Sequence, residues 1–283
     1  MIKVENLTQT YRSGKGIFDL SFTINKGEVF GYLGPNGAGK TTTIRNLLGF
    51  ANADRGNARI RELDCRKQAA DIQKFTGYLP GEIAFFDNMT GIHFLKFIGE
   101  MRKTKDTSLR DNLIDRFELE TDVKIRQMSK GMKQKLGIVT AFMHNPEVYI
   151  LDEPTSGLDP VARDELLELF QELVEDGKTS ILFSTHITSD LEKCADYITY
   201  INNGEIISSR TRDEFKDAFR LIKGPVSEID EIKDNLISYK TSSFNFTGLA
   251  KTGTIKTGGN IIEEVPELDD IMIYFSRRDR HDA

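Results

Sequence analysis

The sequence predicts an α/β fold with an inserted helical subdomain and a small C-terminal α+β appendage. Three observations lead to this prediction. An apolar run at residues 29–33 leads directly into a glycine-rich loop and a helical stretch, a second apolar run at residues 148–151 ends in two acids, and helical periodicity dominates the residues between them. Apolar strands that alternate with helices are typical of a parallel sheet covered by helices.

The strands of the predicted sheet are short apolar runs without polar alternation, as expected for parallel strands covered on both faces. A helix is expected at residues 41–48, and this strand, loop and helix order is what a phosphate-binding loop requires. Asn202, Asn203 and Gly204 predict a hairpin turn, because Asn and Gly accept the positive φ of such turns. The expected strands are residues 29–33, 148–151, 180–184, 197–201 and 205–207.

Apolar residues recur at helical spacing through the middle of the chain. Phe94, Phe97, Ile98 and Met101 form one such series, and a second series follows at residues 109–117. We therefore expect a helical subdomain at about residues 85–143, inserted into an α/β domain that spans residues 1–212.

The pattern changes after about residue 212, and residues 213–283 are expected to form an accessory domain. Residues 213–222 suggest a helix, residues 239–257 suggest small antiparallel strands, and residues 268–275 suggest a short closing helix. Arginines at 277, 278 and 280 would suit an anionic membrane surface or, among their acidic neighbours, a solvated tail. The sequence leaves the role of this domain open.

Composition limits the classes of function. The 283 residues are 39% hydrophobic and 29% charged, with a net charge of −6, so no nucleic-acid partner is expected, because such binders present a basic face. Cys65 and Cys194 have no metal or redox spacing and are expected to be reduced structural residues. The N-terminus does not read as a signal peptide, and no run approaches the ~18 apolar residues of a membrane helix. Any membrane-spanning part is therefore expected on another chain.

The glycine-rich loop carries the strongest chemical signal. Its glycines let the backbone curl and expose N–H groups to phosphate oxygens, at the positive N-terminus of the following helix. Lys40 is expected to reach the β- and γ-phosphates, and Thr41 to ligate Mg²⁺. A chance match to GxxxxGK[ST] is expected in about one chain in a hundred, and the flanking strand and helix lower this further. The loop consists of Gly34, Pro35, Asn36, Gly37, Ala38, Gly39, Lys40 and Thr41.

Two acids end the apolar run at residues 148–151. Asp152 and Glu153 precede Pro154, and ligands of open α/β sheets bind at the carboxyl ends of strands. Asp152 is therefore expected beside the phosphate loop as a Mg²⁺ ligand, and Glu153 is placed to orient or deprotonate an attacking water. A solvated strand end before a proline turn is the alternative, which the nearby phosphate loop makes less favourable.

Further motifs follow in an order that resembles the ABC ATPase family. Residues 128–134 (MSKGMKQ) resemble its LSGGQ signature, residues 156–160 (SGLDP) its D-loop, and residues 184–186 (STH) its switch-histidine loop. Tyr11 precedes the phosphate loop at about the distance of the family's adenine-stacking aromatic. The resemblance covers roughly residues 1–210. Taken singly, Ser129 also reads as a helix N-cap, and Tyr11 as a core residue.

The resemblance implies an ATP hydrolase with ATP and Mg²⁺ as ligands. Glu153 would be the general base, with Lys40 and His186 stabilising the γ-phosphate, and Thr41 and Asp152 would hold the metal. The family assembles head to tail, so Ser129 and Gly131 of one subunit would face the phosphate loop of another. The nucleotide-binding residues implied in this way are Tyr11, residues 34–41, Thr42, Ser129, Gly131 and Asp159.

The family also implies partners and a location. They are a second ABC ATPase, giving a homodimer or a heterodimer, and a separate transmembrane permease subunit that holds the chain at the cytoplasmic face of the cell membrane. Phe85 and Phe86 suit either the surface that receives this permease or the core. The rival interpretations are a non-transport ABC ATPase and a regulatory nucleotide-binding subunit.

Two departures from the family pattern stand out. Lys130 and Met132 replace a glycine and the glutamine of the signature, while Ser129 and Gly131 remain. Gly81 stands where the family's Q-loop has a glutamine, and Glu82 is the candidate to take over part of that role. These variants resemble the ATPases of ABC-2 type exporters. The cargo and the direction of transport do not follow from them.

Overall fold

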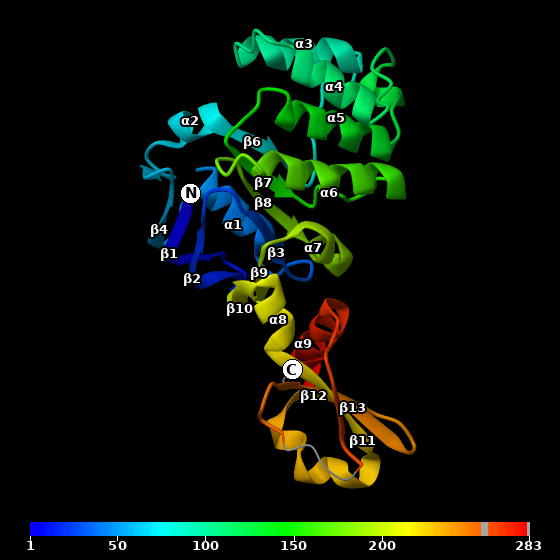
Figure 1. Cartoon of the computed structure of the whole chain (residues 1–283). Helices are drawn as coiled ribbons and strands as arrows, with labels where there is room; N and C mark the ends of the chain where they lie inside the picture. Colours follow the sequence, from blue (N-terminus) through cyan, green and yellow to red (C-terminus); the bar gives the residue numbers. More distant parts are fainter. Residues whose placement is uncertain (256–259, 282–283) are drawn as a thin grey trace. The chain divides into compact units, whose positions relative to one another are not determined.

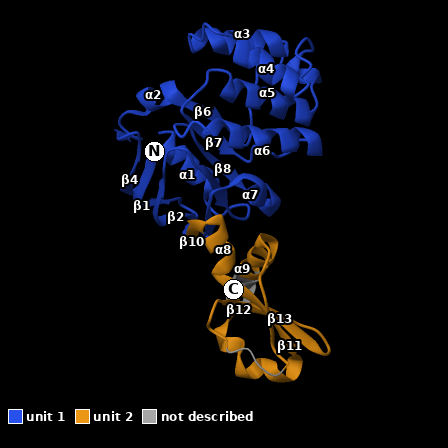
Figure 2. Ribbon diagram, in the orientation of Figure 1, with its two compact units in different colours: residues 1–207 blue, residues 208–283 orange. Residues whose placement is uncertain are grey.

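The computed structural model describes residues 1–255 and 260–281 of the chain. It divides into two compact units, residues 1–207 and 208–283 (Figure 2). The first unit holds the phosphate loop and both acids of the predicted site. The first unit contains two sheets and the second unit one, each with packed helices (Figure 1), which confirms the predicted α/β fold with an α+β appendage.

A six-stranded sheet in the order β10-β9-β3-β8-β7-β6 forms the centre of the first unit. Five of its strands run parallel, and every residue of β3 and β7 is buried, as predicted. Asn203 and Gly204 have φ angles of 47° and 82°, which confirms the hairpin between β9 and β10. The strands are β3 (Val29–Leu33), β6 (Thr76–Leu79), β7 (Val148–Asp152), β8 (Ser180–Thr185), β9 (Tyr197–Asn202) and β10 (Glu205–Thr211).

Successive strand residues point to opposite sides of this sheet, so its apolar strands present apolar side chains on both faces. Helices cover both of these faces. On one face α1 (Lys40–Leu47) packs with Phe30 and Ile150. On the other face, Phe170 of α6 (Pro160–Val174) lies against Phe183 of β8, with ring centroids 5.4 Å apart. The short helices α2 (Ala69–Ile72), η1 (Gln73–Phe75) and α7 (Thr188–Cys194) complete the connections, and both cysteines are buried.

A second sheet that we did not predict contains the N-terminal strands, in the order β2-β1-β4-β5. Its antiparallel strands share a hydrophobic core with α1. The turn between β1 and β2 is closed by a hydrogen bond from the Tyr11 N–H to Lys15 O (2.8 Å), and it carries Tyr11 toward the phosphate loop. The strands are β1 (Ile2–Thr10), β2 (Gly16–Ile24), β4 (Arg55–Ile60) and β5 (Leu63–Asp64).

The inserted helical subdomain contains α3 (Gly91–Met101), α4 (Ser108–Arg116), η2 (Ile125–Gln127) and α5 (Lys130–Phe142), which confirms the predicted insertion. Its two neighbouring phenylalanines differ in environment. Phe85 is half-buried, with its ring edge-on to Phe94 at 5.2 Å, whereas Phe86 remains 55% exposed. Of this pair, Phe86 is therefore the residue available to a partner.

His144 follows α5 and makes the stability of the fold depend on pH. Its Nε2 lies 3.3 Å from Thr76 O, and burial, followed by the nearby Arg102 charge, lowers the pKa of the ring to about 4. In the unfolded chain the pKa returns to ~6.5, so the unfolded state binds more protons between these values and stability falls as the pH falls through this window. We expect His144→Gln to flatten that part of the stability curve, as measured by urea midpoints across it. Equal slopes in both proteins would contradict this role of His144.

The second unit is a four-stranded antiparallel sheet in the order β12-β13-β11-β14. The predicted helix at residues 213–222 is wrong in its second half. α8 ends at Asp217, and residues from Phe219 onward pair with β13 as strand β11, so sheet pairing overrides the local helical spacing. The elements are α8 (Arg212–Asp217), β11 (Phe219–Pro225), η3 (Val226–Glu231), η4 (Lys233–Asn235), β12 (Leu236–Thr241), β13 (Asn245–Lys251), β14 (Ile262–Glu264) and α9 (Leu268–His281).

Strands β12 and β13 confirm the small strands predicted here, and α9 confirms the closing helix and extends beyond it. Residues 256 and 257 of the predicted strand region, and the side chains of the three arginines near the end, lie outside what the structure describes. No helix within the described ranges has the length and apolar character needed to cross a membrane.

Candidate active site

The site lies in a cavity of about 510 Å³ at the carboxyl ends of β3, β7 and β8. It brings together the phosphate loop, the two acids and the histidine, which the sequence places far apart. Among the described residues, the lining is formed by Tyr11, Ser13, Lys15, Gly16, Pro35, Asn36, Gly37, Gly39, Lys40, Thr41, Thr42, Gly81, Asp152, Glu153, Ser156 and His186.

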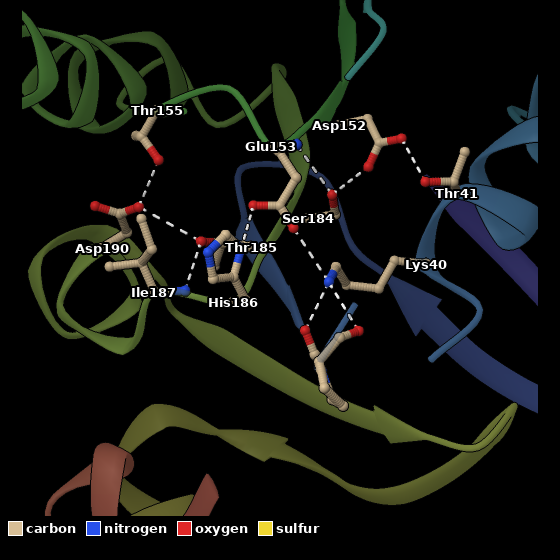
Figure 3. A network of polar contacts seen from close by, with 12 residues as sticks. Lys40, Thr41, Asp152, Glu153, Thr155, Ser184, Thr185, His186, Ile187 and Asp190 are labelled. Atoms are coloured by element: carbon tan, nitrogen blue, oxygen red, sulfur yellow. Dashed lines mark hydrogen bonds and ion pairs between the residues drawn. The ribbon is translucent and has the colours of Figure 1, made fainter. Parts of the chain in front are cut away.

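Lys40 begins α1 and is 6% exposed. Its Nζ donates to Gly34 O at 2.6 Å and to Pro35 O at 3.3 Å, and it lies 3.1 Å from Glu153 Oε1 (Figure 3). A buried ammonium needs such partners, because its desolvation is otherwise costly. Lys40 is thus the cation that connects the phosphate loop to the acidic end of β7.

Asp152 is held by two hydroxyl groups. The Thr41 hydroxyl donates to Asp152 Oδ2 at 2.8 Å, and the Ser184 hydroxyl donates to Oδ1 at 2.5 Å. Asp152 is 3% exposed, and these hydroxyl partners fix the orientation of its carboxylate. Threonine and aspartate oxygens side by side are hard ligands of the type that Mg²⁺ prefers, and the metal-binding role of Thr41 and Asp152 stays a prediction.

Glu153 has an unusual backbone and two charged or ionisable partners. Its φ of 51° lies in the left-handed region, which residues other than glycine rarely adopt. The carboxylate contacts Lys40 through Oε1 and His186 Nδ1 through Oε2 at 2.8 Å. The side chain therefore lies across the cavity between the phosphate loop and the loop after β8.

A buried carboxylate joins the loops that follow β7 and β8. Asp190 accepts hydrogen bonds from the hydroxyl groups of Thr155 (2.7 Å) and Thr185 (3.5 Å), and Arg163 Nε donates to it at 2.6 Å. Thr185 also accepts from the Ile187 N–H (Figure 3). These bonds fix the chain on both sides of His186 relative to the segment that carries Glu153.

The other predicted nucleotide-binding residues divide into two groups. Tyr11 is 41% exposed at the edge of the cavity, so it is not the core residue of the alternative interpretation. Ser129, Gly131 and Asp159 lie outside the described lining. The Ser129 hydroxyl accepts from the Met132 N–H (3.2 Å) as the N-cap of α5, and Asp159 caps α6.

Gly81 lines the cavity close to Asp152. A methyl group at this position would lie 3.5 Å from Asp152 Oδ2, which is an ordinary contact distance. The space next to Gly81 is therefore open at the position where the family has a glutamine side chain. Glu82 is exposed and lies outside the described lining. Its proposed replacement of the glutamine remains a prediction.

Sequence reasoning missed Ser184 and Asp190 as parts of the site. Ser184 belongs to a motif that we had identified, but we assigned no role to its hydroxyl. The signal for Asp190 was weaker, since an aspartate two residues into a helix normally reads as a first-turn acid. Both are completely buried polar groups, and only the folded structure reveals their partners.

A buried strand, a glycine loop and a helix, with Asp152 and Glu153 at the carboxyl end of the nearby strand β7, define a P-loop ATPase. Comparison with known proteins narrows this class. The family model described as "ABC transporter" matches residues 17–156. The bacitracin transport ATP-binding protein BcrA of Bacillus licheniformis is 34% identical over 218 residues, which cover 76% of this chain and 71% of BcrA. The linearmycin resistance ATP-binding protein LnrL of Bacillus subtilis is 34% identical over 219 residues, covering 76% and 70%.

Solved structures agree with this result. An ATP-binding subunit of an ABC transporter has a TM-score of 0.70 at 30% identity, covering 76% of this chain and 92% of that one. A dimeric ATP-binding cassette bound to ADP and Pi has a TM-score of 0.66 at 22% identity, covering 75% and 98%, and shows the same fold. The chain belongs to the ATP-binding proteins of ABC transporters, and it is an ATP hydrolase.

Proposed function

We propose that this chain is the ATPase subunit of an exporter, working as an ATP-bridged dimer that drives a separate transmembrane permease. The observation that supports a dimer is that the predicted nucleotide-binding residues do not all lie in one cavity. The phosphate loop, Asp152, Glu153 and His186 share one cavity, whereas Ser129 and Gly131 lie outside it. A second ABC ATPase, identical or different, would supply its signature residues to this cavity.

The residues fit ATP and Mg²⁺. Gly37 and Gly39 have φ angles of 83° and 111°, and a methyl group at Gly37 would meet no atom within 4 Å, so backbone N–H groups are accessible to phosphate oxygens. Thr41 and Asp152 would hold Mg²⁺, which supplies neutralisation of phosphate charge when bound. Tyr11 would stack on the adenine.

The chain's own groups account for hydrolysis. Glu153 would accept a proton from the water that attacks the γ-phosphorus, as its carboxylate is held between Lys40 and His186. Lys40 and His186 would bind the γ-phosphate oxygens, where charge develops as the bond to the β-phosphate breaks. Cleavage removes the bridge between the two subunits, so the dimer opens.

Export is supported by the similarity to a bacitracin transport protein and a linearmycin resistance protein. The permease would hold the chain peripherally at the cytoplasmic face of the membrane. Phe86, an exposed aromatic side chain of the helical subdomain, is our candidate for contact with it.

The test is capture of partners from native membranes. We expect tagged Glu153→Gln protein, incubated with ATP and detergent-solubilised membranes, to retain one polytopic membrane protein in fixed ratio. Phe86→Glu in the same background should lose that protein while still binding ATP, since the change affects an exposed contact outside the cavity. Recovery of ribosomes, DNA-bound proteins or the chain alone would overturn the exporter assignment and favour a non-transport ATPase.

A further inference from the structure

Gln134 is a buried amide at the end of the signature-like segment. It lies in the second turn of α5, is 7% exposed, and lies outside the described lining of the cavity. Its Nε2 donates to Pro154 O at 2.8 Å and to Glu153 O at 3.4 Å. Buried amides require partners, and here both partners are backbone carbonyls at the residue proposed as general base and the residue after it.

The backbone of Glu153 needs such support. A left-handed φ strains any residue other than glycine and persists where surrounding contacts determine it. On the β8 side, the Glu153 N–H donates to Ser184 Oγ at 3.0 Å and to Ser184 O at 3.2 Å. On the other side, Glu153 O accepts from the Ser156 N–H at 3.1 Å and from Gln134. Gln134 is the side chain that holds this turn from the helical subdomain.

Three side chains in the first two turns of α5 contact the segment after β7: those of Lys130, Gln134 and Lys135. The methylene groups of Lys130 lie against Gly157, where an added methyl group would be 3.2 Å from Cε. The Lys135 ammonium lies 3.4 Å from Asp159 Oδ2. Of these three, Gln134 alone reaches the backbone of Glu153, so it connects α5, the helix capped by Ser129, with the residue whose carboxylate lies in the cavity.

We propose that Gln134 is a positioning residue for Glu153. By fixing the carbonyls of Glu153 and Pro154, its amide keeps the strained turn in the conformation that aims the carboxylate between Lys40 and His186. The hydrogen bonds of the Gln134 amide also connect α5, which contains most of the signature-like segment, to the proposed general base of the same chain. This inference rests on the proposed role of Glu153 as general base.

The first test separates turnover from binding. Gln134→Met keeps the length of the side chain and removes the amide donor. We expect kcat for ATP hydrolysis to fall about 10- to 100-fold, because small displacements of a catalytic group have effects of this size, while the ATP Kd stays within ~2-fold. Gln171→Met is the matched control, since Gln171 Nε2 also donates to a backbone carbonyl, that of Lys193 at 2.9 Å, away from the cavity. The control should keep the wild-type kcat.

A double-mutant cycle distinguishes positioning from general support of the fold. If Gln134 acts through Glu153, Gln134→Met should cause no further loss of turnover in a Glu153→Gln background. An equal loss in both backgrounds, or a wild-type kcat in Gln134→Met, would overturn the proposal. Should Gln134→Met fail to fold, Gln134→Asn takes its place in the same cycle, because it keeps an amide but withdraws it from the carbonyls.

A pH profile provides a second readout. In Gln134→Glu, the new carboxylate faces two carbonyl oxygens, and burial raises its pKa. Protonation restores one donor, so kcat relative to the wild type should recover as the pH is lowered; a constant ratio would contradict the proposal. If Glu153→Gln itself keeps wild-type turnover, the general-base role fails, whereas failure of the Gln134 variants alone removes only the positioning role.

Discussion

Glu153→Gln should retain ATP binding, lose about 10²–10⁴-fold in hydrolysis rate and accumulate as an ATP-bound dimer. The loss has the size expected for removal of a general base. Glutamine has the shape of glutamate: its amide oxygen can accept from Lys40, which lies 3.1 Å from Oε1, and its NH2 group can donate to a deprotonated His186 Nδ1, which lies 2.8 Å from Oε2. The cavity should therefore keep its geometry while it loses the group that takes the proton.

Phosphate release and size-exclusion chromatography with ATP measure the two effects together. Glu147→Gln is a matched control, because Glu147 directly precedes β7 and forms an exposed ion pair with Arg61 at 2.7 Å. Exposed pairs contribute little, so we expect its turnover within ~2-fold of wild type. Wild-type turnover in Glu153→Gln would remove the general-base assignment, and a monomer with bound ATP would argue against the bridged dimer.

The phosphate loop and the acids were predictable because their signals are local. A buried strand, a glycine loop and a helix follow one another along the chain, and β3 has the predicted bounds. The contact between Thr41 and Asp152 joins residues 111 positions apart, yet it follows from the rule that parallel strands bring their carboxyl ends to one edge. The catalytic roles of these residues remain predictions.

Elements that depend on distant pairing were not predictable in the same way. Phe215, Phe219 and Ile222 have helical spacing, but Phe219 pairs with Lys251 and Ile222 with Gly248 in a sheet. The N-terminal sheet was missed, because its strands gain their stability from a core shared with α1. Local propensity is a weak guide where such pairing decides the conformation.

Buried polar contacts are a further feature that could not be predicted from the sequence. Ser184 and Gln134 stand inside motifs that the sequence made visible, yet the motif pattern carries no information on which atoms they contact. Ser184 bridges the Asp152 carboxylate and the Glu153 N–H, and Gln134 holds the Glu153 carbonyl. The contacts of Ser184 and Gln134 with the Glu153 backbone depend on the left-handed turn at Glu153, which no sequence signal indicates.

Lys40→Met should weaken ATP binding about 10- to 100-fold, because a hydrogen bond to a charged group contributes about 1.5–3 kcal/mol. The ammonium is the buried cation of the cavity's phosphate loop, and methionine fills a similar volume without charge or donors. Lys26→Met, at an exposed lysine between β2 and β3, controls for loss of a positive charge.

Titration calorimetry gives the affinity of Lys40→Met, and thermal melts with and without ATP give an independent measure. A ligand stabilises the folded state by RT ln(1 + [L]/Kd), so the ATP-dependent rise in Tm should shrink in Lys40→Met and stay unchanged in Lys26→Met. Retained affinity with lost turnover would assign Lys40 to the transition state alone, since interactions made only there change kcat without changing binding. Unchanged affinity and turnover together would contradict the phosphate-loop assignment, because Lys40 would then contribute neither to nucleotide binding nor to the transition state.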